Sequence, residues 1–100
     1  MIRRTLRPRT PTQSLHQDIA EDRALAGFIF MVDEFRRDNG ATCFLVGERL
    51  VPAGGPAGSM IVFNGSRWHG HGANETHQPR RSMQGTFIRR EDAAGDTQPD

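Results

Sequence analysis

The stretch GSMIVFNGSRWHGHGAN, residues 58–74, decides the fold that we expect. It begins with an apolar run, residues 59–64, that is rich in the β-branched and aromatic side chains favoured in strands. An Asn64-Gly65 pair ends this run and predicts a tight turn, after which a second short run covers residues 68–73. Short strands joined by such turns indicate an antiparallel, all-β fold.

Further strand-like runs lie on both sides of this stretch, with turn-forming residues between them. They cover residues 12–18, 27–33, 42–46 and 83–89. Residues 20–26 alone have a helical pattern, and that segment is short. Parallel α/β sheets need long crossover helices between their strands, so the spacing predicts an antiparallel sandwich or barrel instead.

The composition is that of one globular domain, with 100 residues of which 25% are charged. Basic residues gather in residues 1–11 and acidic ones in residues 91–100. We expect both segments to be solvated tails around a domain of residues 12–90. The chain has no apolar run of membrane-spanning length and a single cysteine, Cys43, so we expect a cytoplasmic protein without a membrane partner.

Two sequence features supply groups that bind metals. Residues i and i+2 of a strand point to the same face, so His16 and Asp18 can offer an imidazole and a carboxylate to one ion. Such a pair also arises by chance on protein surfaces, and it gains meaning only with a third ligand. His69 is that candidate, because two histidines and one carboxylate form the ligand set of non-haem Fe(II) oxygenases. His71 shares a strand face with His69 and is a candidate supporting donor, whereas His77 is expected to be solvated.

A third feature is suited to binding a carboxylate. Arg80 and Ser82 follow His69 in the sequence, and we expect a hairpin through residues 72–79 to bring their strand alongside that of His69. A guanidinium with a hydroxyl two residues further on can hold a carboxylate by forked hydrogen bonds. Arg81 is an alternative to Arg80 for this role, and an ordinary basic pair on an edge strand is the alternative reading of both.

Taken together, these features resemble the phytanoyl-CoA dioxygenase family of Fe(II)- and 2-oxoglutarate-dependent oxygenases. The resemblance covers residues 12–89 and rests on the order and spacing of three stretches. These are LHQD at residues 15–18, FMVDEFRRDNGAT at residues 30–42, and GSMIVFNGSRWHGHGANETHQPRR at residues 58–81. It implies a compact double-stranded β-helix, also called a jelly roll or cupin-type barrel.

The resemblance also implies roles for particular residues. It assigns Fe(II) to His16, Asp18 and His69, and it assigns the far carboxylate of 2-oxoglutarate to Arg80, with help from Ser82 and with Gln17 close to the co-substrate. The implied activity is hydroxylation of a small organic substrate by O2, coupled to oxidative decarboxylation of 2-oxoglutarate to succinate.

Two other functions compete with this one. A metal-binding cupin-like protein without turnover, which needs self-association or a partner, fits a chain in which fifteen residues precede His16. Binding of single-stranded nucleic acid through residues 3–9, with Trp68 or Phe87 as a stacking platform, is the second. We do not expect nucleic acid to be the partner, because the arginines lie in a proline-containing segment and the aromatic side chains are expected in the core. Those expected core residues are Phe28, Phe30, Phe44, Ile61, Phe63 and Phe87, with Trp68 beside His69.

Overall fold

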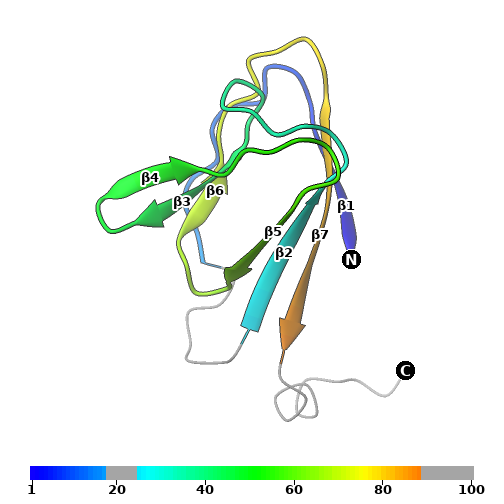
Figure 1. Ribbon diagram of the computed structural model, residues 1–100. Coiled ribbons are helices and arrows are strands. Elements are labelled where there is room, and N and C mark those ends of the chain that lie inside the picture. Colours follow the sequence, from blue (N-terminus) through cyan, green and yellow to red (C-terminus); the bar gives the residue numbers. More distant parts are fainter. Residues whose placement is uncertain (18–24, 89–100) are drawn as a thin grey trace.

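The computed structural model describes residues 1–17 and 25–88. Over these residues the chain forms strands and no helix. The strands are Ile2–Leu6 (β1), Leu25–Met31 (β2), Thr42–Val46 (β3), Arg49–Pro52 (β4), Met60–Asn64 (β5), His69–His71 (β6) and Arg80–Ile88 (β7). They build two antiparallel sheets, a larger one of order β1-β7-β2-β5 and a smaller one of order β4-β3-β6 (Figure 1). The all-β prediction is confirmed, and the two layers are those of a small jelly roll.

The register of the larger sheet aligns side chains in rows on its inner face. In one row Arg4 of β1 lies opposite Ser82 of β7, which in turn lies opposite Met31 of β2. In the neighbouring row Leu6 lies opposite Arg80. Because side chains alternate between the faces of a strand, Arg80 and Ser82 share the inner face, as the sequence predicts.

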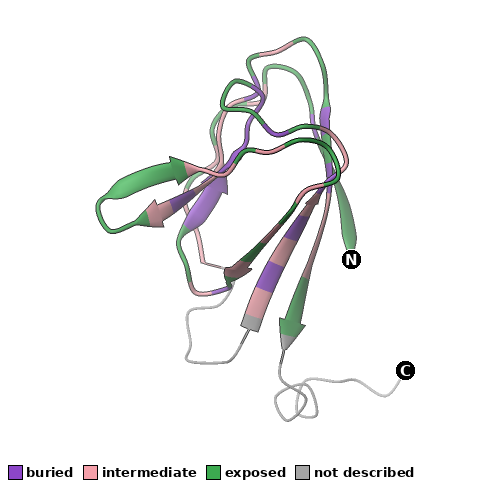
Figure 2. Ribbon diagram, in the orientation of Figure 1, coloured by how far each residue is buried: buried purple, intermediate pink, exposed green. Residues whose placement is uncertain are grey.

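A small apolar core lies between the sheets. It consists of Ile29, Met31, Phe35 and Ala41, with Ile61 and Phe63 packed against it. Burial concentrates on the middle of β2 and on β6, whereas β1 and β4 are mostly exposed (Figure 2). Polar side chains fill much of the remaining interior, and Asn74 and Ser82 are both fully buried.

Residues 1–11 are not the solvated tail that their charge suggests. β1 pairs with β7 from Ile2 opposite Gln84 to Leu6 opposite Arg80. Pairing of this kind uses backbone groups, which basic side chains do not prevent at the edge of a sheet. Leu6 anchors the strand with a side chain that is 8% exposed and lies over Gly40. The domain therefore begins before residue 12, and the expected acidic tail, residues 91–100, lies outside the described residues.

Two predicted elements of the N-terminal half differ from the structure. Residues 12–17 form no continuous strand, and His16 alone makes a β-bridge, with His69. The predicted helix of residues 20–26 falls mostly outside the described residues, and its last two residues, Leu25 and Ala26, belong to β2. Within the described residues no helix is long and apolar enough to cross a membrane.

The predicted hairpin between the His69 and Arg80 strands does not form. β6 pairs with β3, whereas β7 pairs with β1 and β2, so the chain crosses from the smaller sheet to the larger one between them. Residues 72–79 are therefore a crossing connection. As a result His69 and Arg80 lie on sheets that face each other rather than on neighbouring strands.

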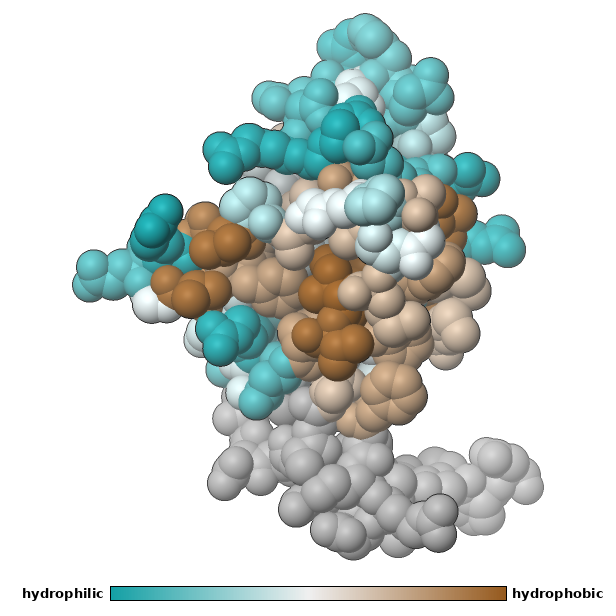
Figure 3. All heavy atoms as spheres, viewed as in Figure 1, coloured by the Kyte–Doolittle hydropathy of each residue, from teal (hydrophilic) through white to brown (hydrophobic). Residues whose placement is uncertain are grey.

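The outer surface carries more apolar side chains than expected. Trp68 is 45% exposed and Phe87 is 59% exposed, so the prediction that both lie in the core is wrong. Met60 and Val62 are 55% and 65% exposed on β5, because they alternate with the inward-facing Ile61 and Phe63. Figure 3 shows apolar side chains gathered over β5, with a second group over β4, a strand that the sequence analysis missed.

Asn74 fastens the crossing connection to the larger sheet. Its Nδ2 donates to the carbonyl oxygens of Leu6 at 3.0 Å and Gln78 at 2.9 Å. Its Oδ1 accepts from the backbone N–H of Thr76 at 3.1 Å and from the Thr76 hydroxyl at 2.7 Å. The end of β1 and the approach to β7 are thus joined by one buried side chain.

Replacing Asn74 with Ala is expected to destabilise the protein by about 2–3 kcal/mol, because it leaves several buried backbone groups without partners. Urea unfolding followed by circular dichroism measures the change. The matched control is His77→Ala in the same connection, where the side chain is exposed and the expected change is below about 0.5 kcal/mol. Equal stabilities for the two variants would contradict this role of Asn74.

Candidate functional site

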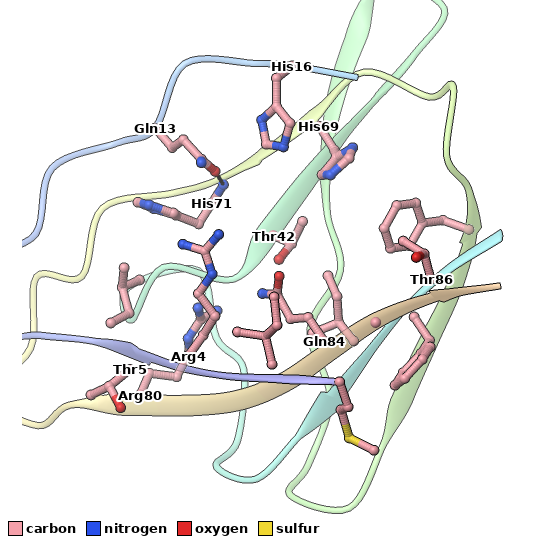
Figure 4. Close-up of a pocket in the computed structure, with 17 residues that line it drawn as sticks. Arg4, Thr5, Gln13, His16, Thr42, His69, His71, Arg80, Gln84 and Thr86 are labelled. Atoms are coloured by element: carbon pink, nitrogen blue, oxygen red, sulfur yellow. Dashed lines mark hydrogen bonds between the residues drawn. The ribbon is translucent and has the colours of Figure 1, made fainter. Parts of the chain in front are cut away.

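A cavity of about 370 Å³ lies between the two sheets. Its walls come from β1, β2, β5 and β7 of the larger sheet, from β3 and β6 of the smaller one, and from the segment of residues 13–16 (Figure 4). The lining combines apolar side chains, such as Ile29 and Phe63, with His16, His69 and Arg80. A concave site of this size, with a few convergent polar groups, is the usual form of a small-molecule site.

His16 and His69 meet at this cavity because their backbones pair. The N–H of each residue donates to the carbonyl oxygen of the other, both at 2.9 Å. Residues paired in this two-way manner project their side chains to the same side. The ring centroids are 4.5 Å apart, and both rings reach into the cavity (Figure 4). Two groups separated by a long stretch of sequence are thus brought together as predicted.

The orientation of the His69 ring suits metal binding. Its Nδ1 lies 2.8 Å from the carbonyl oxygen of Arg67. A carbonyl oxygen only accepts hydrogen bonds, so Nδ1 carries the proton and Nε2 of the neutral ring carries the lone pair. A backbone carbonyl on the far nitrogen is the usual device that fixes the tautomer of a metal-binding histidine.

Aromatic side chains hold the His69 ring in place. Phe63 contacts it edge-on at a centroid distance of 4.8 Å, and Phe44 stacks on it at 5.5 Å. Phe63 can lie there because its strand neighbour is Gly27, where an added Cβ would come within 2.5 Å of the Phe63 ring. A glycine in β2 therefore determines the packing around a residue of the other sheet.

Arg80 places a buried positive charge in the cavity wall. Arg80 is only 3% exposed. Its Nη1 donates to the carbonyl oxygen of Gly40 at 2.8 Å, and its guanidinium lies 3.9 Å from the centre of the Phe35 ring. Desolvation lowers the pKa of Arg80 to about 10, which leaves it cationic at neutral pH. Its Nε has no hydrogen-bond partner among the described residues, so the site has a donor to offer to an anion.

Arg81 takes no part in the cavity. It points to the other face of β7 and binds Asp33 through two hydrogen bonds, Nε to Oδ2 at 2.9 Å and Nη2 to Oδ1 at 2.8 Å. Hydrogen bonding by Arg81 lowers the pKa of Asp33. Of the two arginines between which the sequence left the choice open, Arg80 alone lines the cavity.

The other predicted site residues, Ser82, Gln17 and Asp18, are not among the residues that line the cavity in the described part of the chain. Ser82 is fully buried beside the cavity without lining it, and its hydroxyl has no partner among the described residues. Gln17 donates from Nε2 to the carbonyl oxygen of Ser66 at 2.8 Å and does not line the cavity. Asp18 lies outside the described residues. Within residues 1–17 and 25–88, no three His, Cys, Asp or Glu side chains converge on a common point, and His16 and His69 supply two such groups.

Several residues in the cavity were missed by the sequence analysis. Gln13 accepts from the backbone N–H of His71 at 3.1 Å, and Nδ1 of His71 donates to the carbonyl oxygen of Gly72 at 2.8 Å. Thr42 and Gln84 also line the cavity. Gln84 could have been predicted, because residues 80, 82 and 84 of one strand point to the same face. Gln13 lies in an irregular segment, where no such alternation applies.

Known proteins of similar sequence match this chain over only part of their own length. No protein-family model matches the chain. The uncharacterized protein Mb1539 of Mycobacterium bovis is 31% identical over 96 residues, and dioxygenase cdmA of Talaromyces verruculosus is 30% identical over 102 residues. These matches cover 76% and 78% of this chain but 34% and 35% of the relatives, so the chain spans about a third of their length.

Solved structures share the fold. EvdMO1 superimposes with a TM-score of 0.79 at 20% identity, covering 88% of this chain and 26% of that one. EvdO2 from Micromonospora carbonacea var. aurantiaca, complexed with 2-oxoglutarate, superimposes with a TM-score of 0.69 at 20% identity, covering 86% of this chain and 49% of that one. The expected cupin-like jelly roll is thereby confirmed.

Replacing Gly27 with Ala is expected to displace Phe63 and to disturb His69 with it. Overpacking of this kind lowers stability by about 1–3 kcal/mol, which urea unfolding measures. A change in the NMR signals of the His69 ring would report the displacement directly. Gly72→Ala is the control, because the atom nearest to its added Cβ is a backbone oxygen at 3.6 Å, an ordinary contact. An unchanged His69 signal in Gly27→Ala would contradict the coupling.

Proposed function

We propose that the protein is an Fe(II)- and 2-oxoglutarate-dependent oxygenase that hydroxylates a small organic substrate. One observation carries this proposal: two imidazoles are held together by their backbones at a cavity whose wall contains the buried guanidinium of Arg80. The two imidazoles suit a divalent metal ion, and the guanidinium suits a carboxylate.

The donor set fits iron. Neutral imidazole nitrogens are good ligands for Fe(II), and the hydrogen bond from His69 Nδ1 to the Arg67 carbonyl keeps Nε2 in the ligating form. We assign the carboxylate of Asp18 as the third ligand on sequence grounds alone, because it follows His16 by two positions and completes a set of two histidines and one carboxylate. Three protein ligands leave further positions for substrates.

The environment of Arg80 fits the far carboxylate of 2-oxoglutarate. The guanidinium lies on an aromatic ring and donates to one carbonyl, but no described carboxylate contacts it. A buried cation gains much from an anionic partner in a site of low polarity. Ser82, one position further on the same face, has a buried hydroxyl that can join this contact if the ligand reaches it.

When bound, the iron and 2-oxoglutarate supply the oxidising power for hydroxylation by O2, with release of succinate and CO2. The residues of this chain do the positioning. His16 and His69 would hold the iron, Arg80 would orient the co-substrate, and Phe63 and Ile29 form apolar walls that limit the access of water.

The comparisons support the proposal. The relative from Talaromyces verruculosus bears the name dioxygenase, and EvdO2 binds 2-oxoglutarate on the same fold. Membership of the phytanoyl-CoA dioxygenase family is part of the proposal and rests on the motif order around His16, His69 and Arg80.

Replacing His16, His69 or Asp18 with Ala is expected to weaken Fe(II) binding by about 100-fold or more, because each variant removes one ligand. Anaerobic titration calorimetry with Fe(II) measures the affinity. His77→Ala serves as the control, since this exposed histidine is far from the cavity lining and its variant is expected to bind as the parent does. Wild-type affinity in the His69 variant would exclude the proposed metal site.

Replacing Arg80 with Gln is expected to weaken 2-oxoglutarate binding by about 100-fold, the effect of losing one partner of a buried charge pair. Arg80→Lys keeps the charge without the forked geometry and is expected to lose about 10-fold. The matched control is Arg81→Gln on the outer face, which is expected to leave the affinity unchanged. Thermal unfolding of each variant verifies folding, and equal losses for Arg80 and Arg81 would contradict the assignment.

A metal-binding protein without turnover is the second candidate. The observation in its favour is the exposed apolar face at Met60, Val62 and Phe87, which self-association or a partner would cover. Oxygen-dependent formation of succinate from 2-oxoglutarate separates the two functions. An iron-loaded protein that binds both ligands but forms no succinate with any of a varied set of substrates supports the second.

A further inference from the structure

We propose that Arg4 forms a second anion-binding position in the cavity, and that the substrate to be oxidised therefore carries a carboxylate or phosphate on a mainly apolar body. This inference rests on the proposed function, since it assigns Arg80 to 2-oxoglutarate and Arg4 to the other substrate. It concerns a residue that the sequence had indicated as part of a tail.

The register places Arg4 on the inner face of the larger sheet. Arg4 lies opposite Ser82, and Leu6 lies opposite Arg80, so Arg4 and Arg80 are diagonal neighbours across β1 and β7. Such neighbours are about 7–8 Å apart at the backbone. Both line the cavity, and Figure 4 shows both rising from the wall that these two strands form. The adjacent Arg3 lies opposite Met83 and belongs to the outer face.

The charge of the cavity favours an anion. Two guanidiniums lie in one wall, and the described lining contains no Asp or Glu. Arg4 makes no ion pair with a described residue. Among the described residues, Glu34 and Asp38 pair with Arg36, and Asp33 pairs with Arg81. Two like charges at this separation repel each other until anions neutralise them.

The two arginines differ in depth, which favours two separate anions. Arg80 is 3% exposed and is fixed by Gly40 and Phe35, whereas Arg4 lines the same cavity with an exposed side chain. A co-substrate held at Arg80 and at the metal occupies the interior. A substrate that enters afterwards passes Arg4, and its apolar body meets Ile2, Ile29 and Phe63 in the lining.

The test uses aryl probes that differ in charge. Benzoate, phenyl phosphate and the neutral benzamide are titrated by calorimetry into the whole chain, with and without saturating 2-oxoglutarate. We expect at least one of the two anions to bind about 10-fold more tightly than benzamide, and we expect Arg4→Ala to remove this difference. Arg3→Ala is the matched control on the same strand and is expected to keep it. The anion that loses more affinity in Arg4→Ala identifies carboxylate or phosphate as the preferred group.

Three outcomes would overturn the inference: no binding of either anion by the parent chain, equal effects of Arg4→Ala and Arg3→Ala, or mutual exclusion of the probes and 2-oxoglutarate, which would place both on one cation. Titration of 2-oxoglutarate alone tests the proposed function separately. It is expected to be unchanged within about twofold by Arg4→Ala, because Arg80 makes the charged contact. If the parent chain fails to bind 2-oxoglutarate while Arg4 still discriminates the probes, the proposed function fails and the anion-binding position stands.

Discussion

The backbone pairing of His16 with His69 is the constraint on which the site depends. Two reciprocal hydrogen bonds fix the relative position of two segments that belong to no common ladder, and the geometry of such a pair turns both imidazoles to one side. The rest of the fold supports this contact. β3 positions β6 from the other side, with Phe44 opposite His69, and the larger sheet supplies Phe63 against the ring.

Because the two sheets face each other, the larger sheet determines which side chains lie across the cavity from the two imidazoles. Because the chain crosses between sheets after β6, Arg80 comes to the opposite wall instead of the next strand. A hairpin would have put the cation beside His69 with little room between them. The crossing leaves a volume large enough for a small dicarboxylate, and Asn74 holds the connection that makes it possible.

Sequence reasoning succeeded where a local pattern carries the information. Alternation along β7 was enough to place Arg80 and Ser82 on one face. Glycine-rich turns, with Asn-Gly pairs at two of them, marked most strands. It failed where tertiary contacts override composition. β1 looks like a basic tail because its stabilisation comes from backbone pairing with β7 and from Leu6 alone among its side chains. The effect of Gly27 on His69 also has no local sequence signal, because Phe63 on a third strand contacts both residues.

Two side chains of the core also line the cavity. They are Ile29 and Phe63, and the guanidinium of Arg80 lies on the ring of Phe35, a fully buried core residue. A molecule that occupies the cavity therefore completes the interior of the domain as well as its site. Occupancy and resistance to heat are linked in such a molecule, because any ligand that binds only the folded state shifts the unfolding equilibrium by mass action. The melting temperature of this chain is thus a readout of whatever it binds, whether or not a reaction follows.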